Sequence, residues 1–435
     1  MDPTGLHDPG GVPPAGRAGR PVSASAALDA IEDGSRVFVS GGAAAPIVLD
    51  RLMAEQADRW TGIELVCDRL LEPLAVFDHP GRPFRLVSLQ PSPAVDGMRS
   101  AGAYRSAAGP FSGFGGLISP AGPYPVDVAV VHVSPPGPDG RHSLGVSVAT
   151  PLAAMAAASL VIAQVNPRMP YTFGSGELAA DRFDLLVDAE HELLETPGPT
   201  QRDAAMTTIG GEVAGLIPDG ATLQIGIGAV ADAVLDGLRN HTDLSVHSGM
   251  ISDGIVALAG SGALTGSSHP LFPGKIVAGL IGGTRTVFDF VDRNPAVRIV
   301  AATISHGAAV LAALPRFTAI NSAVEVDLTG AANGEFIGSR VISGPGGAPD
   351  YAAAAAAHQD GRYIVALPAT AGGRRLSRIV RRLDPARPPT VPGTHVGAVV
   401  TEHGTALLDG RSAAARATAL IDIAEPDVRR TLSAT

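Results

Sequence analysis

The glycines Gly226 and Gly228 close the apolar run Gln224-Ile-Gly-Ile-Gly, where a strand is expected to turn into a helix. A residue without a Cβ lets a ligand phosphate or carbonyl come close to the backbone, and the amides that begin a helix attract negative charge. The turn is therefore a candidate ligand-binding loop. Because most α/β proteins contain several such turns, this one alone is weak evidence for a site.

Lys275 is the only lysine in a chain whose lysines and arginines together number 32. Arginine cannot replace lysine where a compact ammonium on a flexible stem is required. Lys275 is therefore a candidate for a specific role, and chance survival in an arginine-biased sequence is the alternative. The single cysteine, Cys67, ends an apolar run and is expected to be a small buried residue rather than a nucleophile.

The composition describes a globular protein of 435 residues, 45% hydrophobic and 17% charged. A net charge of −10 argues against nucleic-acid binding, which relies on clustered Lys and Arg. One cysteine excludes an intramolecular disulfide and a cysteine-based zinc cluster. The richest apolar stretch, Leu152–Val165, is too short to span a membrane, and residues 1–20 read as a disordered leader without a signal-peptide core. We expect a cytoplasmic protein that binds neither nucleic acid nor membrane.

Apolar strand-like runs alternate with helix-length segments, which is typical of α/β proteins with mainly parallel sheets. The pattern begins twice, at Arg36 and at Thr222, each time as a strand, a glycine turn and an Ala-rich helix. This apparent duplication predicts two domains, residues 21–196 and 201–435, joined by the Pro-rich linker Glu195–Thr200. The Gly- and Pro-rich segment Pro110–Pro125 is expected to be a long loop. The expected strands are Arg36–Ser40, Ile63–Cys67, Val126–Val133, Thr222–Ile227, Leu244–His247 and Lys275–Ile281, and the expected helices are Ile47–Ala57 and Val230–Leu238.

Many segments between about Val22 and Val428 resemble, in order, those of the acetyl-CoA hydrolase/transferase family. They are Ser134-Pro-Pro-Gly-Pro-Asp-Gly-Arg-His-Ser-Leu-Gly-Val-Ser, Asn166-Pro-Arg-Met-Pro, His247–Asp253, Pro273-Gly-Lys-Ile-Val, Ile320-Asn-Ser-Ala-Val-Glu-Val-Asp-Leu-Thr-Gly, Ser343-Gly-Pro-Gly-Gly, Ala366-Leu-Pro-Ala-Thr-Ala, Ser377-Arg-Ile-Val and Val400-Thr-Glu-His-Gly. The resemblance implies two CoA-transferase-type α/β domains with mainly parallel sheets and an active site in the cleft between them. It also implies a homo-oligomer, for which we expect a dimer.

In enzymes of this family, a glutamate attacks an acyl-CoA, and the CoA thiolate then returns to give a glutamyl-CoA thioester that a second carboxylate takes over. A side-chain amide and the backbone amides of a Gly-Gly loop, which is Gly346-Gly347 here, stabilise the oxyanion. The resemblance implies a CoA thioester as substrate, a small-molecule acceptor and no metal. The residues expected to bind CoA are Gly226, Gly228, Lys275, Gly344, Gly346 and Gly347.

The sequence departs from the family at three polar positions. The third residue of His247-Ser-Gly-Met, a glutamate in the family, is Gly249 here; the family's asparagine becomes Ser305, and a histidine after Met-Pro becomes Phe173. A glycine cannot attack a thioester, and its small size is expected to leave room for a larger acyl group or an incoming nucleophile. The sequence therefore predicts direct acyl transfer, cyclisation or hydrolysis of a bound acyl-CoA or acyl-pantetheine, without a glutamyl-CoA intermediate.

Replacement catalysts are expected near the changed positions. His306 is a candidate base near neutral pH, with a solvated or helix-capping histidine as the alternative. Ser248 is a candidate nucleophile, although His247 would point to the opposite face of a continuing strand. Two further hypotheses stay open: a conventional acetate or 4-hydroxybutyrate type of CoA-transferase that uses another carboxylate, and a CoA-binding relic without activity. Glu335 and Glu402 are the carboxylates that could take the place of the glutamate. Glu325 and Asp327 share one face of an expected strand and are expected to be structural.

Overall fold

The computed structural model describes residues 16–78, 84–100, 102–107, 109–198, 203–373 and 376–433. Contacts divide the chain into two compact units. The first holds the chain up to Thr196 together with Val277–Ser305, and the second holds Pro197–Ile276 and the chain from His306 onward. The predicted domains, residues 21–196 and 201–435, are each continuous in sequence, whereas the first compact unit is not. The predicted domain boundaries stay predictions. Most of the expected leader, and the end of the expected linker, lie outside the described residues.

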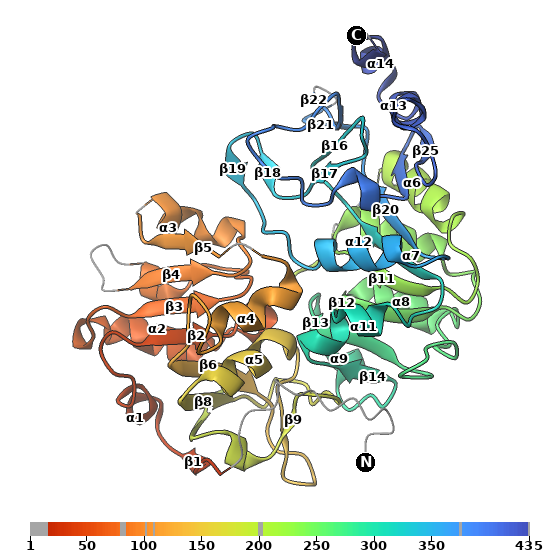
Figure 1. The fold of residues 1–435 in the computed structure, drawn as a ribbon. Coiled ribbons are helices and arrows are strands. Elements are labelled where there is room, and N and C mark those ends of the chain that lie inside the picture. The colour runs from red at the N-terminus through yellow and green to blue at the C-terminus, as the bar shows by residue number, and fades with distance from the viewer. Residues whose placement is uncertain are drawn as a thin grey trace. The chain divides into compact units, whose positions relative to one another are not determined.

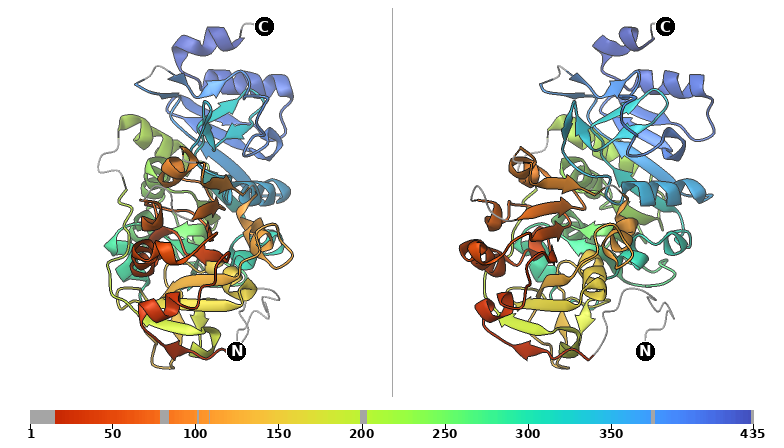
Figure 2. Two further views of the ribbon diagram at one scale, coloured as in Figure 1. Left: turned by 90° about the vertical axis from the view of Figure 1, so that its left-hand side faces the viewer. Right: turned by 60° about the vertical axis from the view of Figure 1, so that its left-hand side comes forward.

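The first unit is built on a parallel sheet in which β2 and β6 are neighbours. The apolar residues Val37 and Val39 of β2 share a buried cluster with Leu49 and Met53 of α2, so the alternation of the strand places α2 on that face. The sheet order is β1 (Arg20–Pro21), β10 (Leu185–Asp188), β8 (Leu160–Val165), β6 (Val128–Val133), β2 (Arg36–Val39), β3 (Glu64–Cys67), β4 (Arg85–Ser88) and β5 (Tyr104–Ser106). The helices, visible in Figures 1 and 2, are α1 (Ala24–Leu28), α2 (Ile47–Glu55), α3 (Asp96–Ser100), α4 (Phe114–Ile118) and α5 (Ala149–Ala157).

The segment of residues 277–305 adds further elements to the first unit. Backbone bonds tie it to earlier residues, since Val148 donates to Gly279 O at 3.3 Å and Ile281 donates to Val146 O at 2.8 Å. Its elements are β13 (Ile276–Ile281), which begins one residue earlier, α9 (Arg285–Val291), β14 (Val297–Ile299) and α10 (Ala302–Ser305). The short strands β7 (His142–Ser143) and β9 (Glu177–Leu178) pair with each other.

The second unit also carries a mainly parallel sheet, because β12, β11, β15, β20 and β24 pair in parallel and only the final pair, β24 with β25, is antiparallel. Its strands are β12 (Ser245–Ile251), β11 (Thr222–Ile225), β15 (Phe317–Asn321), β20 (Arg362–Ala366), β24 (Ala398–Thr401) and β25 (Gly404–Leu407). Its helices are α6 (Ala204–Ala214), α7 (Ala229–Gly237), α8 (Asp253–Gly260), α11 (Ala308–Leu311), α12 (Ala348–Ala357), α13 (Ala413–Asp422) and α14 (Pro426–Ser433). Small pieces of sheet are made by β16 (Glu325–Asp327), β17 (Ala332–Asn333), β18 (Phe336–Ile337), β19 (Arg340–Val341), β21 (Thr370–Ala371), β22 (Leu376–Ser377) and β23 (Ile379–Val380).

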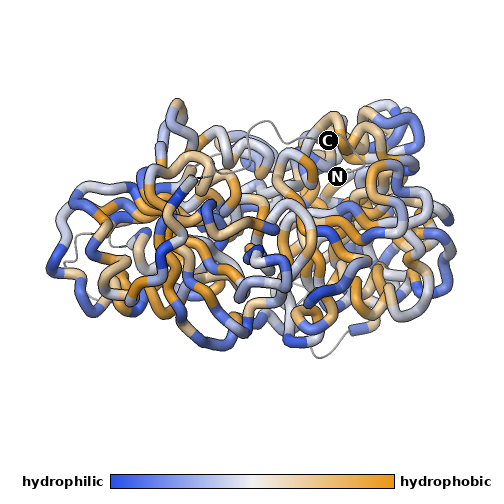
Figure 3. Tube along the Cα trace, turned by 90° about the horizontal axis from the view of Figure 1, so that it is seen from below, coloured by the Kyte–Doolittle hydropathy of each residue, from blue (hydrophilic) through white to orange (hydrophobic). Residues whose placement is uncertain are grey.

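The α/β class, the two domains and the mainly parallel sheets agree with the sequence-based expectation, and each expected strand and helix is present within a few residues of its expected bounds. Figure 3 shows hydrophobic stretches, in orange, interspersed with hydrophilic ones, in blue, along the chain. The expectation of a long loop at Pro110–Pro125 is wrong. The structure forms α4 there, because Phe111, Phe114 and Ile118 recur at helical spacing and are buried.

Candidate active site

Gly249 lies near the carboxyl end of β12, in the second unit, and its nearest neighbours are His306 and Tyr351. A Cβ at position 249 would stand 3.2 Å from His306 Nε2 and 3.3 Å from the Tyr351 hydroxyl. Both distances are shorter than ordinary van der Waals contact, so a side chain at this position would require one of these neighbours to shift slightly. Space next to the Gly249 backbone is therefore limited by His306 and Tyr351, and the expected room for a larger acyl group or an incoming nucleophile stays a prediction.

Gly347 approaches the same histidine from another element. It precedes α12, where a proline and Asp350 in the first turn and a run of alanines favour a helix. A Cβ on Gly347 would lie 2.5 Å from His306 Nε2 and 2.8 Å from Tyr351 Cε2, so a side chain there would force these rings to move. The preceding Gly346 has a φ of +56°, a conformation that favours glycine. The structure thus brings three predicted residues together, with His306 Nε2 facing both Gly249 and Gly347.

Tyr351 completes this group, and no motif or spacing in the sequence pointed to it. It stands one helical turn after Gly347 on the buried face of α12, and its ring packs on that of His306 with centroids 4.7 Å apart. The side chain is 2% exposed, and burial raises the pKa of its hydroxyl well above the usual value. Tyr351 is therefore a neutral phenol that is able to donate a hydrogen bond.

His306 is held between α10 and α11, and it is 3% exposed. Burial, with the electrostatic effect of His247, lowers its pKa to about 3. An imidazole with so low a pKa is neutral at pH 7 and accepts a proton poorly. The environment of His306 therefore favours a hydrogen-bonding role over the base role expected from the sequence.

The low pKa of His306 predicts a loss of stability in mild acid. Unfolded histidine has a pKa of about 6.5, so above that value both states are neutral and the group contributes no pH dependence. Below about pH 6.5, His306 binds a proton in the unfolded chain but not in the folded chain. The free energy of unfolding therefore falls by about 1.4 kcal/mol per pH unit until the pKa of the folded state is reached. Between pH 7.5 and 5.0, we expect wild type to lose about 2 kcal/mol more than His306→Gln in denaturant titrations. Equal losses would contradict a depressed pKa at this residue.

Ser248 and Ser305 both direct their hydroxyls to backbone. Ser248 Oγ donates to Ile225 O at 3.1 Å and accepts from Ile225 N at 3.4 Å, so its side chain links β12 to β11. Ser305 Oγ donates to Ala301 O at 3.2 Å within the α10 turn. Both serines are buried, and their proposed catalytic roles stay predictions.

The glycine turn after β11 leads into α7, which begins after Gly228 at a φ of +101°. A Cβ on Gly226 would lie 2.9 Å from the Oδ1 atom of Asn321, which in turn donates from Nδ2 to Gln224 Oε1 at 2.8 Å. This amide pair sits at the carboxyl ends of β11 and β15, where ligands commonly bind in open α/β sheets. Nothing in the local sequence pattern singled it out. Lys275 is half-buried in the turn before β13, and its role in CoA binding, like that of Gly344, stays a prediction.

The alternative carboxylates are occupied by contacts of their own. Glu325 accepts from Asn333 at 3.0 Å, Asp327 from the Thr329 hydroxyl at 2.6 Å, and Glu335 from the Thr390 hydroxyl at 2.8 Å. Burial raises the pKa of Glu335. Each of these bonds supports a turn or a short strand.

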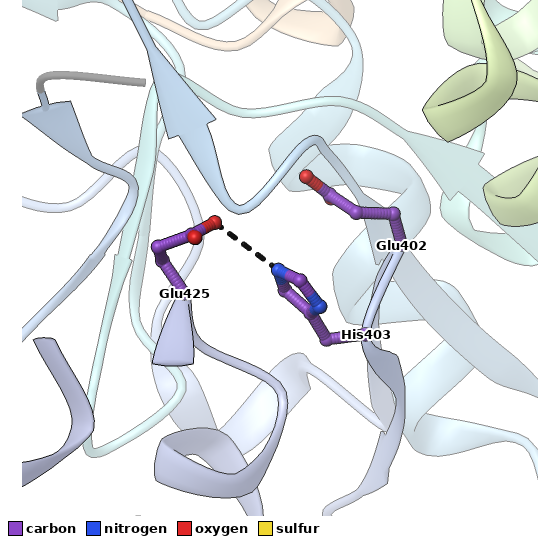
Figure 4. Close-up of side chains that lie close together, drawn as sticks. All are labelled: Glu402, His403 and Glu425. Atoms are coloured by element: carbon purple, nitrogen blue, oxygen red, sulfur yellow. Dashed lines mark hydrogen bonds and ion pairs between the residues drawn. The ribbon is translucent and has the colours of Figure 1, made fainter. Parts of the chain in front are cut away.

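Glu402 lies in a separate group with His403 and Glu425 (Figure 4). It accepts from Ala369 N at 2.7 Å, while His403 Nε2 lies 3.2 Å from Glu425 Oε2. Their ligand atoms lie within 4.8 Å of one another, which is the arrangement most like a metal-ligand set among the described residues. These bonds already account for one oxygen of each carboxylate and one nitrogen of the histidine, and we assign the group no metal.

In the first unit, Phe173 packs edge-on against Tyr171, and the Arg298 guanidinium lies 5.6 Å from its ring centre. The Phe173 ring therefore makes packing contacts with both neighbours. Cys67 is fully buried, as expected. No helix among the described residues is long and apolar enough to cross a membrane.

Known proteins resemble this chain along most of its length. The acetyl-CoA hydrolase/transferase N-terminal domain matches residues 20–181, and the C-terminal domain of the same family matches residues 283–435. The 4-hydroxybutyrate coenzyme A transferase of Clostridium kluyveri is 42% identical over 308 residues, which is 71% of this chain and 72% of that protein. The succinyl-CoA:cyclohexane-1-carboxylate CoA transferase of Geobacter metallireducens is 34% identical over 71% of each chain.

Solved structures agree with these matches. RipA from Yersinia pestis superposes with a TM-score of 0.88 at 26% identity, over 95% of this chain and 96% of that one. The 4-hydroxybutyrate CoA-transferase of Porphyromonas gingivalis superposes with a TM-score of 0.79 at 31% identity, over the same shares. The chain therefore belongs to the acetyl-CoA hydrolase/transferase family and is an acyl-CoA transferase- or hydrolase-like enzyme.

Proposed function

We propose that this enzyme binds an acyl-CoA or acyl-pantetheine thioester and transfers or releases its acyl group without forming a glutamyl-CoA intermediate. One observation carries the proposal. Position 249, where the family resemblance implies the attacking glutamate, has no side chain, and the space beside it is held by His306 and Tyr351. The relatives named above act on CoA thioesters according to their names, and this supports the substrate class.

In the proposed reaction, a water, amine or hydroxyl attacks the thioester carbonyl directly. The new bond forms at the carbonyl carbon, negative charge develops on its oxygen, and collapse breaks the C–S bond and releases CoA thiolate, which takes up the proton lost by the nucleophile. Neutral donors in a water-excluded site would stabilise the charge on oxygen. The glycine turn at Gly226 and Gly228, together with Lys275 and the Gly344–Gly347 loop, would hold the CoA moiety. A small-molecule acceptor, a dimeric assembly, a cytoplasmic location and the absence of a metal stay predictions.

A trapping experiment tests the missing intermediate. The enzyme is incubated with acetyl-CoA, butyryl-CoA and 4-hydroxybutyryl-CoA, then treated with borohydride or hydroxylamine and examined by intact-protein and peptide mass spectrometry. We expect CoA release without modified protein, whereas a family member with glutamate at the matching position should give the adduct. A glutamyl-CoA adduct on this chain would overturn the proposal in favour of a displaced carboxylate. Failure to bind or turn over any of the thioesters would instead indicate a relic without activity.

A further inference from the structure

A groove of about 680 Å³ crosses the amino ends of β2, β3, β4 and β5, which are neighbouring strands of the first unit (Figure 1). Three glycines line it, Gly34, Gly62 and Gly102, each two residues before a strand and each with a φ between +70° and +74°. A Cβ on Gly34 or Gly102 would meet nothing within 4 Å, so the groove is open beside these turns. Its volume is in the range of small-molecule sites.

The register of the strands places charged side chains next to one another in this groove. Arg36 of β2 is level with Glu64 of β3, and Glu64 is level with Arg85 of β4. Arg105 of β5 is level with Val87, two residues beyond Arg85, and therefore points to the same face. The residue that follows each of Arg36, Glu64 and Arg85 belongs to the buried cluster that contains α2. The charged side chains thus share the opposite face of the sheet.

Arg36 is already occupied by contacts within the groove. Its Nε donates to Glu64 Oε2 at 2.7 Å, and its Nη1 donates to Pro125 O at 3.1 Å. Asp127, just before β6, accepts from the Arg36 backbone amide through Oδ2 at 2.8 Å. The charge of Glu64 is therefore balanced by Arg36, while its Oε1 atom has no hydrogen bond to any described residue and faces the groove.

Arg85 and Arg105 are different, because both are exposed and neither forms an ion pair with a described residue. From the spacing of strands and the rise along them, their Cα atoms lie about 8 Å apart, and two arginine side chains can meet on one anion across that distance. A phosphate monoester carries close to two negative charges at pH 7 and three acceptor oxygens, so it can satisfy two guanidinium groups, whereas a carboxylate satisfies one.

We propose that this groove binds a phosphate monoester of a small hydroxylated compound. Arg85 and Arg105 hold the phosphate, and Glu64 Oε1 accepts a hydrogen bond from a neighbouring hydroxyl. No bond is made or broken in the ligand. The proposal goes beyond the proposed function and does not rest on it, because Gly249, His306 and Tyr351 belong to the second unit and the groove to the first.

Calorimetric titration of the full chain tests the ligand class, with glycerol 3-phosphate and ribose 5-phosphate as probes. We expect saturable binding with a Kd of about 1 mM or tighter at pH 7.5. Affinity should fall on going to pH 5.0, because the monoester loses its second charge at a pKa of about 6. Inorganic phosphate, sulfate and succinate should each bind at least several-fold more weakly. Equal binding of sulfate or succinate would mean a general attraction of anions and would overturn the proposal.

Arginine variants test the location of the site. Arg85→Ala and Arg105→Ala should each weaken binding of glycerol 3-phosphate about tenfold or more, since each removes a charge-assisted contact. Arg20→Ala is the matched control, because Arg20 is also exposed and lies on β1, the opposite edge strand of the same sheet. Ala103→Glu keeps both arginines but adds a competing carboxylate to the groove, and it should abolish binding. Wild-type affinity in Arg105→Ala, or an equal loss in Arg20→Ala, would contradict the proposal.

A last measurement separates this groove from the CoA site. KM for acyl-CoA, or the Kd of acyl-CoA if no thioester is turned over, should be the same in Arg105→Ala as in wild type. A raised value would assign the groove to the CoA substrate and overturn the proposal of a separate ligand. Failure of the proposed function alone would leave the binding of glycerol 3-phosphate unchanged. Thermal unfolding of each variant establishes that it folds before these comparisons are made.

Discussion

Replacement of His306 by alanine is expected to lower kcat for acyl-CoA release by about 10²–10³-fold, with a much smaller change in KM. Removing one donor from an oxyanion site typically has this effect, because the lost bond is stronger in the transition state than in the bound substrate. The measurement is steady-state release of CoA thiol from the best thioester found in the trapping experiment.

Two further variants test whether the loss of activity comes from the missing hydrogen-bond donor. His306→Gln keeps an N–H donor near the position of Nε2 and should retain more activity than the alanine variant. His358→Ala removes a histidine outside the group and should behave as wild type. A loss of less than tenfold in His306→Ala, or a glutamine variant no better than alanine, would remove His306 from the reaction.

Gly249→Glu is expected not to restore a glutamyl-CoA cycle, and to lower the free energy of unfolding by about 1–3 kcal/mol. Its Cβ meets His306 and Tyr351 at 3.2–3.3 Å, so the side chain is forced into a filled region, and a carboxylate there is poorly solvated. Borohydride trapping tests for the glutamyl-CoA adduct, and thermal unfolding measures the loss of stability.

The double variant Gly249→Glu with His306→Ala removes the obstructing ring. We expect it to recover stability relative to the single variant and to give a trapped adduct with acetyl-CoA. Gly211→Ala is the control for a plain glycine replacement, since a Cβ there meets nothing within 4 Å on α6 and the change should be neutral or stabilising. An adduct in the single Gly249→Glu variant would contradict this prediction, because it would mean that the His306 and Tyr351 side chains move aside for the glutamate.

The strands and glycine turns of this protein could be predicted because each is encoded locally. Strand β6 is apolar except for His132, and Gly228 marks the start of α7 by its position after β11. At Pro110–Pro125 the Gly- and Pro-rich composition favours a loop, whereas the spacing of Phe111, Phe114 and Ile118 favours the helix that forms.

The candidate site was predictable only in part. The family resemblance pointed to Gly249, His306 and Gly347, which the structure brings together. Tyr351 could not be found that way, because its place beside His306 comes from the packing of residues distant in the chain and from neither spacing nor composition. The lowered pKa of His306 could not be predicted from the sequence either, because it depends on how completely the folded chain excludes water from the ring.

The discontinuous first unit has a consequence for synthesis of the protein. Its elements β13 to α10 follow the whole Pro197–Ile276 segment, which belongs to the other unit. A ribosome adding 5–20 residues per second needs roughly 5–20 s to pass from Thr196 to Ser305. During that time the first unit lacks the strands and helices of residues 277–305. The N-terminal part of the nascent chain therefore cannot complete its compact unit until Ser305 has been made. A fragment that ends at the linker would lack residues 277–305 altogether.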